Sequence, residues 1–558
     1  MTSVQAIADS PYLDLLLRGA AATSDRLVEA ASRSLDDLAH RPTMRAVLAL
    51  VAVDIAEGAD SPATHERANA ALDYAAHLAT LQDDGGLFSS EGNLLSPPDT
   101  AFAINDLCLC VGLIDRYAPG RFEELRAHLA RIAAAAAPAL IDGGVHTPNH
   151  RWELASALAA LNVHWPDPRL VSRAERWLAE GVDIDEDGLY SERSAIYAAE
   201  VTNPSLISLA RDLTRPELLE HVRRNLRATT ALVEDDGEVE NVHSRRQDQR
   251  LRYDVESYLS PLRLFAILDG DADLSRIVSQ ILGRPLREPE RHLADLLHAP
   301  ELGAKLPDAS PASTSSATFY PASRLLRLRE NDLSVSIFAG SDFGTTGRIS
   351  SGLSNSSTLV RARRGDLVLR SVRVSPTFFA LGCIRPQSME RTSTGAILSE
   401  RRASGYYDPL PDGVAGPVDK PDDEGRYFAS MDFDRRPLRE LSLETTVRVD
   451  VDRDGVDLHL SFTGLETRYA VELVIDGEPT IDGARPTDDG WWIDGRSAMV
   501  RHGNQSLSIE TDPGDDHPPD FDDGETFTYT GGRDRIPGTR LLIGGSTLAP
   551  RRIRLRFS

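Results

Sequence analysis

Five side chains in the first half of the chain have the chemical types needed to move a proton beside a negative charge. They are Asn149, His150, Arg193, Tyr197 and His243. An imidazole or a phenol can accept and return a proton when its surroundings tune its pKa, and an amide or a guanidinium can stabilise an anion by donating hydrogen bonds. The set therefore predicts proton transfer next to an anionic group of a ligand.

These residues belong to four acidic corners, each of which follows a mostly apolar helical stretch. The corners read DDGGLFSSEGNLLSPPD (83–99), DGGVHTPNHRW (142–152), DEDGLYSERSAIY (185–197) and EDDGEVENVHSRRQDQR (234–250). A helix that ends at Asp-Gly is expected to turn there, because glycine adopts the left-handed conformation that closes a helix C-terminus. Successive corners start 59, 43 and 49 residues apart, which fits one helical hairpin per unit. We expect all four corners at the same end of a stack of hairpins.

The periodicity of the apolar residues changes in the middle of the chain. Up to about residue 300 they recur every three or four positions, which predicts amphipathic helices. Such segments are 67–82, 103–118, 122–141 and 216–233. Later they alternate with polar residues, which predicts antiparallel strands. Such segments are 333–340, 357–374, 441–462, 468–476 and 551–558.

A chain of 558 residues is long enough for more than one domain. We expect an α+β multidomain protein with a helical domain over 1–301, a Pro- and Ser-containing linker over 302–319 and an antiparallel β domain over 320–558. The polar interval 384–432 is expected to form loops. The segment DVDRDG (450–455) matches the start of a calcium loop, but Ser461 stands where a glutamate is needed, so we interpret it as a hairpin turn.

Composition excludes several classes of partner. The formal net charge of −25 argues against a nucleic-acid-binding surface. No uninterrupted apolar stretch is long enough to span a membrane, and the N-terminus has no basic region of a secretory signal, so we expect a cytoplasmic protein unless a signal was removed. The three cysteines, Cys108, Cys110 and Cys383, are expected to be buried thiols rather than a disulfide framework or a zinc site.

With these motifs in view, the chain resembles the heparinase II/III-type polysaccharide lyases, whose relatives include alginate and chondroitin lyases. The Asn149-His150 pair of T-P-N-H-R-W and the segment D-G-L-Y-S-E-R-S-A-I-Y, which ends at Tyr197, carry the resemblance. It covers the whole chain and implies an (α/α) toroid, an incomplete barrel, followed by an antiparallel β-sandwich. It also implies a lyase that cleaves uronate-containing polysaccharides or oligosaccharides without a cofactor. The family's His-rich metal segment would correspond to 347–366, which contains no histidine, so no metal is expected.

Cleavage by β-elimination starts with removal of the weakly acidic proton at C5 of the uronate. The enzyme must neutralise the carboxylate, take this proton and protonate the leaving oxygen. Thr147 and Pro148 look like the N-cap and first residue of a helix, which would place Asn149 and His150 in its first turn near the carboxylate. Alternatively, Asn149 only caps the helix and His150 packs in the interior.

The resemblance assigns the proton shuttle to Tyr197. Arg193, one helical turn earlier if the segment is helical, would lower the pKa of its phenol. Tyr190 is the rival for this role. A further catalytic group would come from His243 or from the arginines around it.

Further side chains of the corners are candidates for substrate binding. They are Asn93, Asp99, Trp152, Tyr190, Glu192, Arg245 and Arg246. The two arginines can hold a uronate or sulfate by charge-assisted hydrogen bonds, although they could equally pair with nearby carboxylates. Phe88 and Trp152 could stack on sugar faces, although for the tryptophan packing in the core is the favoured interpretation.

Two other functions fit the same sequence. In a glycoside hydrolase on a toroid, a pair of carboxylates would act as acid and base. Candidates for that pair are Asp99, Asp187, Glu192 and Glu240. A carbohydrate-binding protein would keep the scaffold and catalyse nothing. The products separate the three possibilities, because only elimination leaves a C4–C5 double bond.

Overall fold

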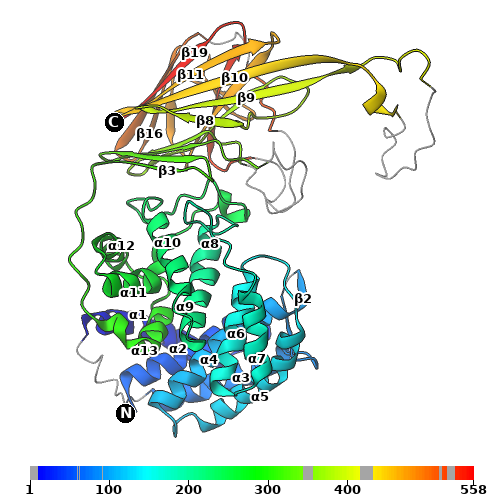
Figure 1. Ribbon diagram of the computed structural model, residues 1–558. Helices are drawn as coiled ribbons and strands as arrows, with labels where there is room; N and C mark the ends of the chain where they lie inside the picture. Colours follow the sequence, from blue (N-terminus) through cyan, green and yellow to red (C-terminus); the bar gives the residue numbers. More distant parts are fainter. Residues whose placement is uncertain are drawn as a thin grey trace. The chain divides into compact units, whose positions relative to one another are not determined.

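The computed structural model describes residues 10–59, 61, 63–90, 92–342, 356–414, 431–513, 518–523 and 535–558. It divides into two compact units (Figure 1). The first unit contains the chain up to Ser244 and Leu251–Ala312, and the second contains Arg245–Arg250 and Ser313–Ser558. The second unit therefore begins inside the segment 302–319 that was expected to be a linker.

The first unit is built mainly from α-helices. They are α1 (Pro11–Ala31), α2 (His40–Glu57), α3 (Thr64–Leu81), α4 (Pro97–Tyr117), α5 (Glu123–Asp142), α6 (His150–His164), α7 (Pro168–Leu178), α8 (Ala195–Tyr197), α9 (Asn203–Asp212), α10 (Leu218–Thr230), α11 (Leu259–Asp269), α12 (Ala272–Leu282) and α13 (Pro289–His298). Short turns of other helix types are η2 (Ala198–Thr202), η4 (Val255–Tyr258) and η5 (Pro300–Gly303). The four helical segments predicted from periodicity correspond to α3, α4, α5 and α10 and are confirmed.

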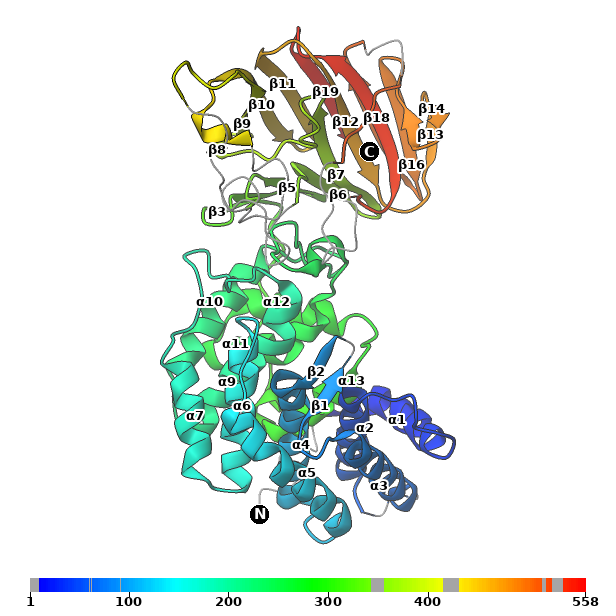
Figure 2. The same cartoon turned by 90° about the vertical axis from the view of Figure 1, so that its right-hand side faces the viewer.

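The helices of the first unit form two concentric layers. The inner layer runs through α13, α2, α4, α6 and α9, each in contact with the next, and α11 contacts α13; η2 and η4 join the α9 and α11 parts of the ring. Each inner helix packs against an outer partner: α3 on α2, α5 on α4, α7 on α6, α10 on α9, α12 on α11 and α1 on α13 (Figures 1 and 2). This arrangement is an (α/α) toroid.

Local sequence signals determine where several of these helices begin and end. Ser96 caps α4 by accepting a hydrogen bond from the backbone N–H of Asp99, and Pro97 occupies the first helical position. Asp271 caps α12 in the same way, and Gly270 closes α11 in the left-handed conformation. The inner helices α2 and α6 are buried on most of their surface, as their many Ala and Leu residues require.

The acidic corners are turns of their own rather than helix caps. At Asp83, Asp185 and Glu234 the carbonyl accepts a hydrogen bond from the N–H of a glycine three residues later, and the N–H donates to the carbonyl four residues later. The three glycines have positive φ of 86°, 81° and 87°. The first turn is followed by the hairpin of β1 (Phe88–Ser90) and β2 (Asn93–Ser96), which the helical periodicity did not predict. The corner at Asp142 differs, because Gly143 is extended with φ −69°.

The second unit consists of two sheets. Its strands are β3 (Ser315–Tyr320), β4 (Leu325–Glu330), β5 (Leu333–Phe338), β6 (Val360–Arg364), β7 (Leu367–Pro376), β8 (Ser388–Arg391), β9 (Gly395–Tyr407), β10 (Leu438–Asp452), β11 (Gly455–Gly464), β12 (Arg468–Ile475), β13 (Thr480–Asp482), β14 (Arg485–Thr487), β15 (Gly490–Trp492), β16 (Ser497–His502), β17 (Gln505–Thr511), β18 (Thr539–Ser546) and β19 (Arg551–Phe557). The predicted strand segments are confirmed, and β10 and β11 form the expected hairpin across 450–455.

Within the described residues, the strand orders are β13-β16-β17-β19-β11-β10-β9-β8 and β14-β15-β18-β12-β7-β6-β5-β4-β3. The described pairings are antiparallel except that between β15 and β18. Apolar side chains from both sheets, among them Val372, Val449 and Ile543, form one core. The unit is thus a β-sandwich, and the expected α+β architecture of toroid followed by sandwich is confirmed.

The expectation that 384–432 is a loop was wrong for its first part. Strand β9 runs from Gly395 to Tyr407 and pairs along its length with β10. Its buried positions include Glu400 and Arg402, which form an ion pair with each other, so polar composition hid the alternation. Residues 415–430 lie outside the described residues.

Candidate active site

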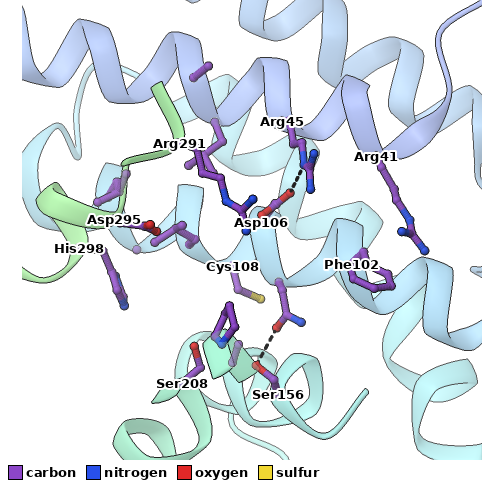
Figure 3. Close-up of a pocket in the computed structure, with 18 of the residues that line it drawn as sticks. Arg41, Arg45, Phe102, Asp106, Cys108, Ser156, Ser208, Arg291, Asp295 and His298 are labelled. Carbon is purple, nitrogen blue, oxygen red and sulfur yellow. Dashed lines mark hydrogen bonds and ion pairs between the residues drawn. The ribbon is translucent and has the colours of Figure 1, made fainter. Parts of the chain in front are cut away.

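The inner helices of the first unit surround a cavity of about 780 Å³, which we call the axial cavity. Its lining follows α4 from Phe102 to Arg116 and α6 from Glu153 to His164, so it extends along the helices (Figure 3). Asn105 of α4 and Ser205 of α9 both donate hydrogen bonds to Glu153 of α6, at 2.7 and 3.1 Å. Asn105, Glu153 and Ser205 all lie in the N-terminal halves of their helices. Their contacts show that α4, α6 and α9 begin at the same end of the toroid.

Asn149 and Glu192, from two different corners, meet at this end. The amide Nδ2 of Asn149 donates a hydrogen bond of 2.6 Å to the Glu192 carboxylate, and the amide oxygen accepts one of 3.1 Å from the Thr147 hydroxyl. Both Asn149 and Glu192 are buried. The predicted start of the helix is corrected: α6 begins at His150, and Thr147 orients the Asn149 side chain instead of capping the helix.

His150 occupies the first position of α6 and is buried. Its ring packs edge-on against Phe102 of α4, with ring centroids 6.3 Å apart, and against His146, with centroids 4.9 Å apart. The imidazole therefore lies beside Phe102, which lines the axial cavity.

Tyr197 lies at the junction of α8 and the π-helix η2. The hydroxyl of Ser194 accepts a hydrogen bond from the Tyr197 backbone N–H and so fixes the start of α8. Single π-helical turns are frequent at functional sites, because the extra residue redirects neighbouring side chains. Tyr197 is half-buried, unlike Tyr190.

Arg193 does not lie one helical turn before Tyr197, because the helix begins only at Ala195. Its backbone is left-handed with φ 50°, a conformation that is unfavourable for residues other than glycine. The guanidinium Nε lies 3.9 Å from the Asp185 carboxylate. Arg193 also lines a small cavity of about 10 Å³ together with Glu240 and His243. The third and fourth corners therefore meet here.

The hydroxyl of Tyr190 belongs to a buried structural network. It donates a hydrogen bond of 2.8 Å to the amide oxygen of Asn203, whose nitrogen donates to Asn225. Burial raises the pKa of Tyr190 well above its usual value. Such a phenol is poorly suited to exchange a proton with a ligand.

Asn93 and Asp99 of the first corner lie in a network with an arginine that the sequence analysis did not single out. Asn93 donates a hydrogen bond of 2.9 Å to the Asp99 carboxylate, which also forms an ion pair with Arg41. Burial acts to raise the pKa of Asp99, but the charge of Arg41 and the hydrogen bonds from Ser96 and Asn93 outweigh it and lower the pKa. Asp99 is therefore ionised.

Two aromatic residues expected to stack on sugars are in the core. Trp152 is 0% exposed, and its indole N–H donates a hydrogen bond of 3.2 Å to Asp183. Phe88 is buried and stacks on His40, with centroids 4.9 Å apart. Phe88 directly follows the tight turn at Asp83, and Trp152 lies in the first turn of the inner helix α6.

Arg245 and Arg246 belong to the second unit. Arg245 forms an ion pair with Asp342, with Nε and the carboxylate oxygen 2.8 Å apart. Arg246 contacts the side chain of Gln247 at 3.4 Å. Asp342 is 97 residues later in the chain, so this partner is not one of the nearby carboxylates expected from the sequence.

Glu153 is a functional candidate that sequence reasoning missed. Burial raises its pKa to about 7, although the hydrogen bonds from Asn105 and Ser205 act in the opposite direction. The carboxyl lines the axial cavity, one helical turn after Asn149. A glutamate between Trp152 and Leu154 in a helix full of apolar residues was the signal that could have identified it.

Among the described residues, no group of three or more His, Cys, Asp or Glu side chains is arranged to hold a metal ion. Part of the expected metal-segment counterpart, 347–355, lies outside the described residues. No helix in the described part of the chain is long and apolar enough to cross a membrane.

No protein-family model and no curated protein matches the sequence. The fold is similar to three solved structures. A chondroitin AC lyase from Streptomyces coelicolor A3, in complex with chondroitin sulphate, matches with a TM-score of 0.54 and 12% identity over 98% of this chain and 77% of that one. The heparan sulfate lyase HepC from Pedobacter heparinus has a TM-score of 0.46 and 11% identity over 93% and 76% of the two chains. A Paenibacillus xanthan lyase has a TM-score of 0.49 and 8% identity over 93% and 51%.

The fold of this chain, a toroid followed by a sandwich, is similar to that of the chondroitin AC lyase.

Proposed function

We propose that the protein is a polysaccharide lyase that cleaves a uronate-containing glycan by β-elimination. The observation that carries the proposal is the oriented amide of Asn149. Its oxygen accepts from Thr147 and its nitrogen donates to Glu192, so the remaining N–H has a determined direction. That donor, at the start of α6, is suited to a carboxylate that becomes more basic as the C5 proton leaves.

The proton is taken and returned by side chains of the second, third and fourth corners. Tyr197 is the preferred shuttle, because it is half-buried next to a π-helical turn, whereas the Tyr190 hydroxyl is bonded to Asn203. His150 and His243 are the candidates for a second proton acceptor or for a donor to the uronate.

The substrate class is supported by the fold and by the residue types. Chondroitin AC lyase, which has the same fold, binds chondroitin sulphate. Asn149 and His150 lie at the start of α6, where the helix dipole favours an anion, and Arg193 and His243 line one small cavity. A polysaccharide with uronate units provides that anion next to the proton to be removed.

A glycoside hydrolase is the second candidate, and Glu153 is the observation that favours it. A carboxyl with a pKa of about 7 that lines a cavity has the property of a general acid. Its partner would be Asp106, whose pKa burial raises and which lies 3.9 Å from Arg45. Hydrolysis leaves no double bond in the product.

Product chemistry tests the two candidates. Chondroitin, heparan sulfate, hyaluronan, xanthan and alginate are each incubated with the protein, and near-ultraviolet absorbance and reducing ends are recorded together. We expect absorbance to rise with reducing ends on at least one polymer. Reducing ends without absorbance would assign the hydrolase, and neither signal on any of these polymers would contradict the proposal.

A further inference from the structure

We propose that Arg41 and Phe102 form a subsite for the anionic group, carboxylate or sulfate, of a sugar unit of the ligand. The subsite is next to His150 and within the first unit. The inference rests on the proposed function for the statement that the ligand is a glycan, but the binding preference that it predicts is measured independently of catalysis.

The three side chains form a row from α2 through α4 to α6. The Cζ atom of Arg41 lies 3.6 Å from the centroid of the Phe102 ring, so the guanidinium stacks on that ring. The other neighbour of Phe102 is His150, whose ring centroid is 6.3 Å away at an interplanar angle of 84°. A ligand group held by Arg41 is therefore separated from His150 by the Phe102 ring.

Asp99 fixes the position of the Arg41 guanidinium but accepts a hydrogen bond from only one of its nitrogen atoms. The ion pair is made by Nη2 of Arg41, and Asp99 is itself fixed by Asn93 and by the Ser96 cap of α4. An arginine has five N–H donors in a planar fork. Within the described residues, the Arg41 side chain donates a hydrogen bond only to Asp99, and 35% of it is exposed.

This combination of an anchored, stacked and partly open guanidinium matches the recognition of planar or tetrahedral oxyanions. Other arginines of the axial cavity also have partners: Arg291 pairs with Glu200, Arg211 pairs with Asp212, and Arg45 lies 3.9 Å from Asp106. Arg41 differs from these because it also stacks on the Phe102 ring. Arg41 is also at the end of the cavity where α4 and α6 begin, since Phe102 and Glu153 line it there. The geometry therefore points to an anionic ligand group at Arg41 rather than deeper in the cavity.

Binding of three monosaccharides tests the subsite with the full-length protein. Calorimetric or NMR titrations use glucuronate, glucose 6-sulfate and glucose, which share a ring but differ in the anionic group. We expect at least one of the two anions to bind roughly 10- to 100-fold more tightly than glucose, as one charge-assisted contact allows. Preference for glucuronate assigns a carboxylate, and preference for glucose 6-sulfate assigns a sulfate.

Arg41→Gln should abolish this preference, while Arg18→Gln, which removes an exposed cation from α1, should retain it. If Arg41→Gln lowers the melting temperature strongly, Arg41→Lys is used instead. Lysine keeps the positive charge but lacks the planar guanidinium, so this variant should lose only part of the preference for the anion. Phe102→Leu should reduce the preference for the anion, because it removes the ring on which the Arg41 guanidinium stacks.

Equal binding of the three sugars to the wild type, or an unchanged preference in Arg41→Gln, would overturn the subsite. These outcomes are separate from those of the polymer assay. A protein that produces no double bond but keeps an Arg41-dependent preference would refute the lyase proposal alone. A protein that eliminates but shows no such preference would refute the subsite alone.

Discussion

The side-chain amide of Asn149 donates a hydrogen bond of 2.6 Å to the carboxylate of Glu192, 43 residues later in the chain. This contact joins the start of α6 to the turn that precedes Tyr197. It also changes how the two residues can be tested. A substitution of Glu192 releases the Asn149 amide, so loss of activity in a Glu192 variant does not by itself identify a catalytic carboxylate.

Asn149→Ala should lower the rate of elimination far more than it weakens substrate binding. The amide opposes charge that grows only toward the transition state, and loss of one such donor typically lowers kcat roughly 100- to 1,000-fold. Steady-state kinetics on the most active polymer measures kcat and KM separately. Glu153→Gln and Asp106→Asn are the comparison for a hydrolase: inactive carboxylate variants beside an active Asn149→Ala would reject the lyase.

Tyr197→Phe should nearly abolish turnover while the protein keeps its stability. Only the proton-bearing oxygen is removed, and a general acid or base typically contributes roughly 100- to 10,000-fold. Tyr190→Phe is the matched control. It removes the hydrogen bond to Asn203 in a buried network, so it should lower the free energy of unfolding by about 1–3 kcal/mol and keep most of the turnover. The reverse pattern would transfer the shuttle to Tyr190.

Glu153 should make the first unit less stable as the pH rises. Its pKa is raised from 4.5 to about 7, so the folded state holds the proton more tightly than the unfolded state. The resulting stability is fully present below pH 4.5 and is lost as the pH rises through about 7, a total of about 3 kcal/mol.

Denaturant unfolding of the wild type and of Glu153→Gln at pH 5 and pH 8 measures this contribution. Glutamine can keep contacts with Asn105 and Ser205 but cannot ionise. The variant should therefore lose less stability between the two pH values than the wild type does. An equal loss in both proteins would show that other groups cause the pH dependence.

Glu472→Gln should destabilise the second unit by about 3–5 kcal/mol. The Glu472 carboxylate lies 2.6 Å from Nε of Arg373 and 2.6 Å from Nε of Arg540, and all three side chains are buried. Removing the negative charge leaves Asp523, which lies 3.0 Å from Arg373 and 3.9 Å from Arg540, as the acidic group beside the two buried cations. Glu444→Gln is the control, because its ion pair with Arg401 is exposed and such pairs contribute little. Calorimetric unfolding of both variants checks the difference.

The sequence by itself determined the elements and their order. The spacing of Ala and Leu in α4 and α5 and the alternation in β10 and β11 are local patterns. Residues three or four positions apart in a helix, or two apart in a strand, lie on the same face, so the sequence alone shows which face is apolar. The corners that hold Asn149, Glu192 and Tyr197 could be recognised because glycine and acidic residues interrupt those patterns. The hairpin β1–β2 was too short to show a period.

Only the tertiary structure decided which corner residues meet and which are buried in other roles. Asn149 contacts Glu192 because the packing of the inner layer brings α6 and the turn before α8 together. No local sequence pattern could predict this contact. Trp152 and Tyr190 have the residue types of a sugar-binding site, but their positions face the interior. Arg41 was missed because its partners, Asp99 and Phe102, lie on another helix, and the raised pKa of Glu153 exists only after folding removes water from its carboxyl.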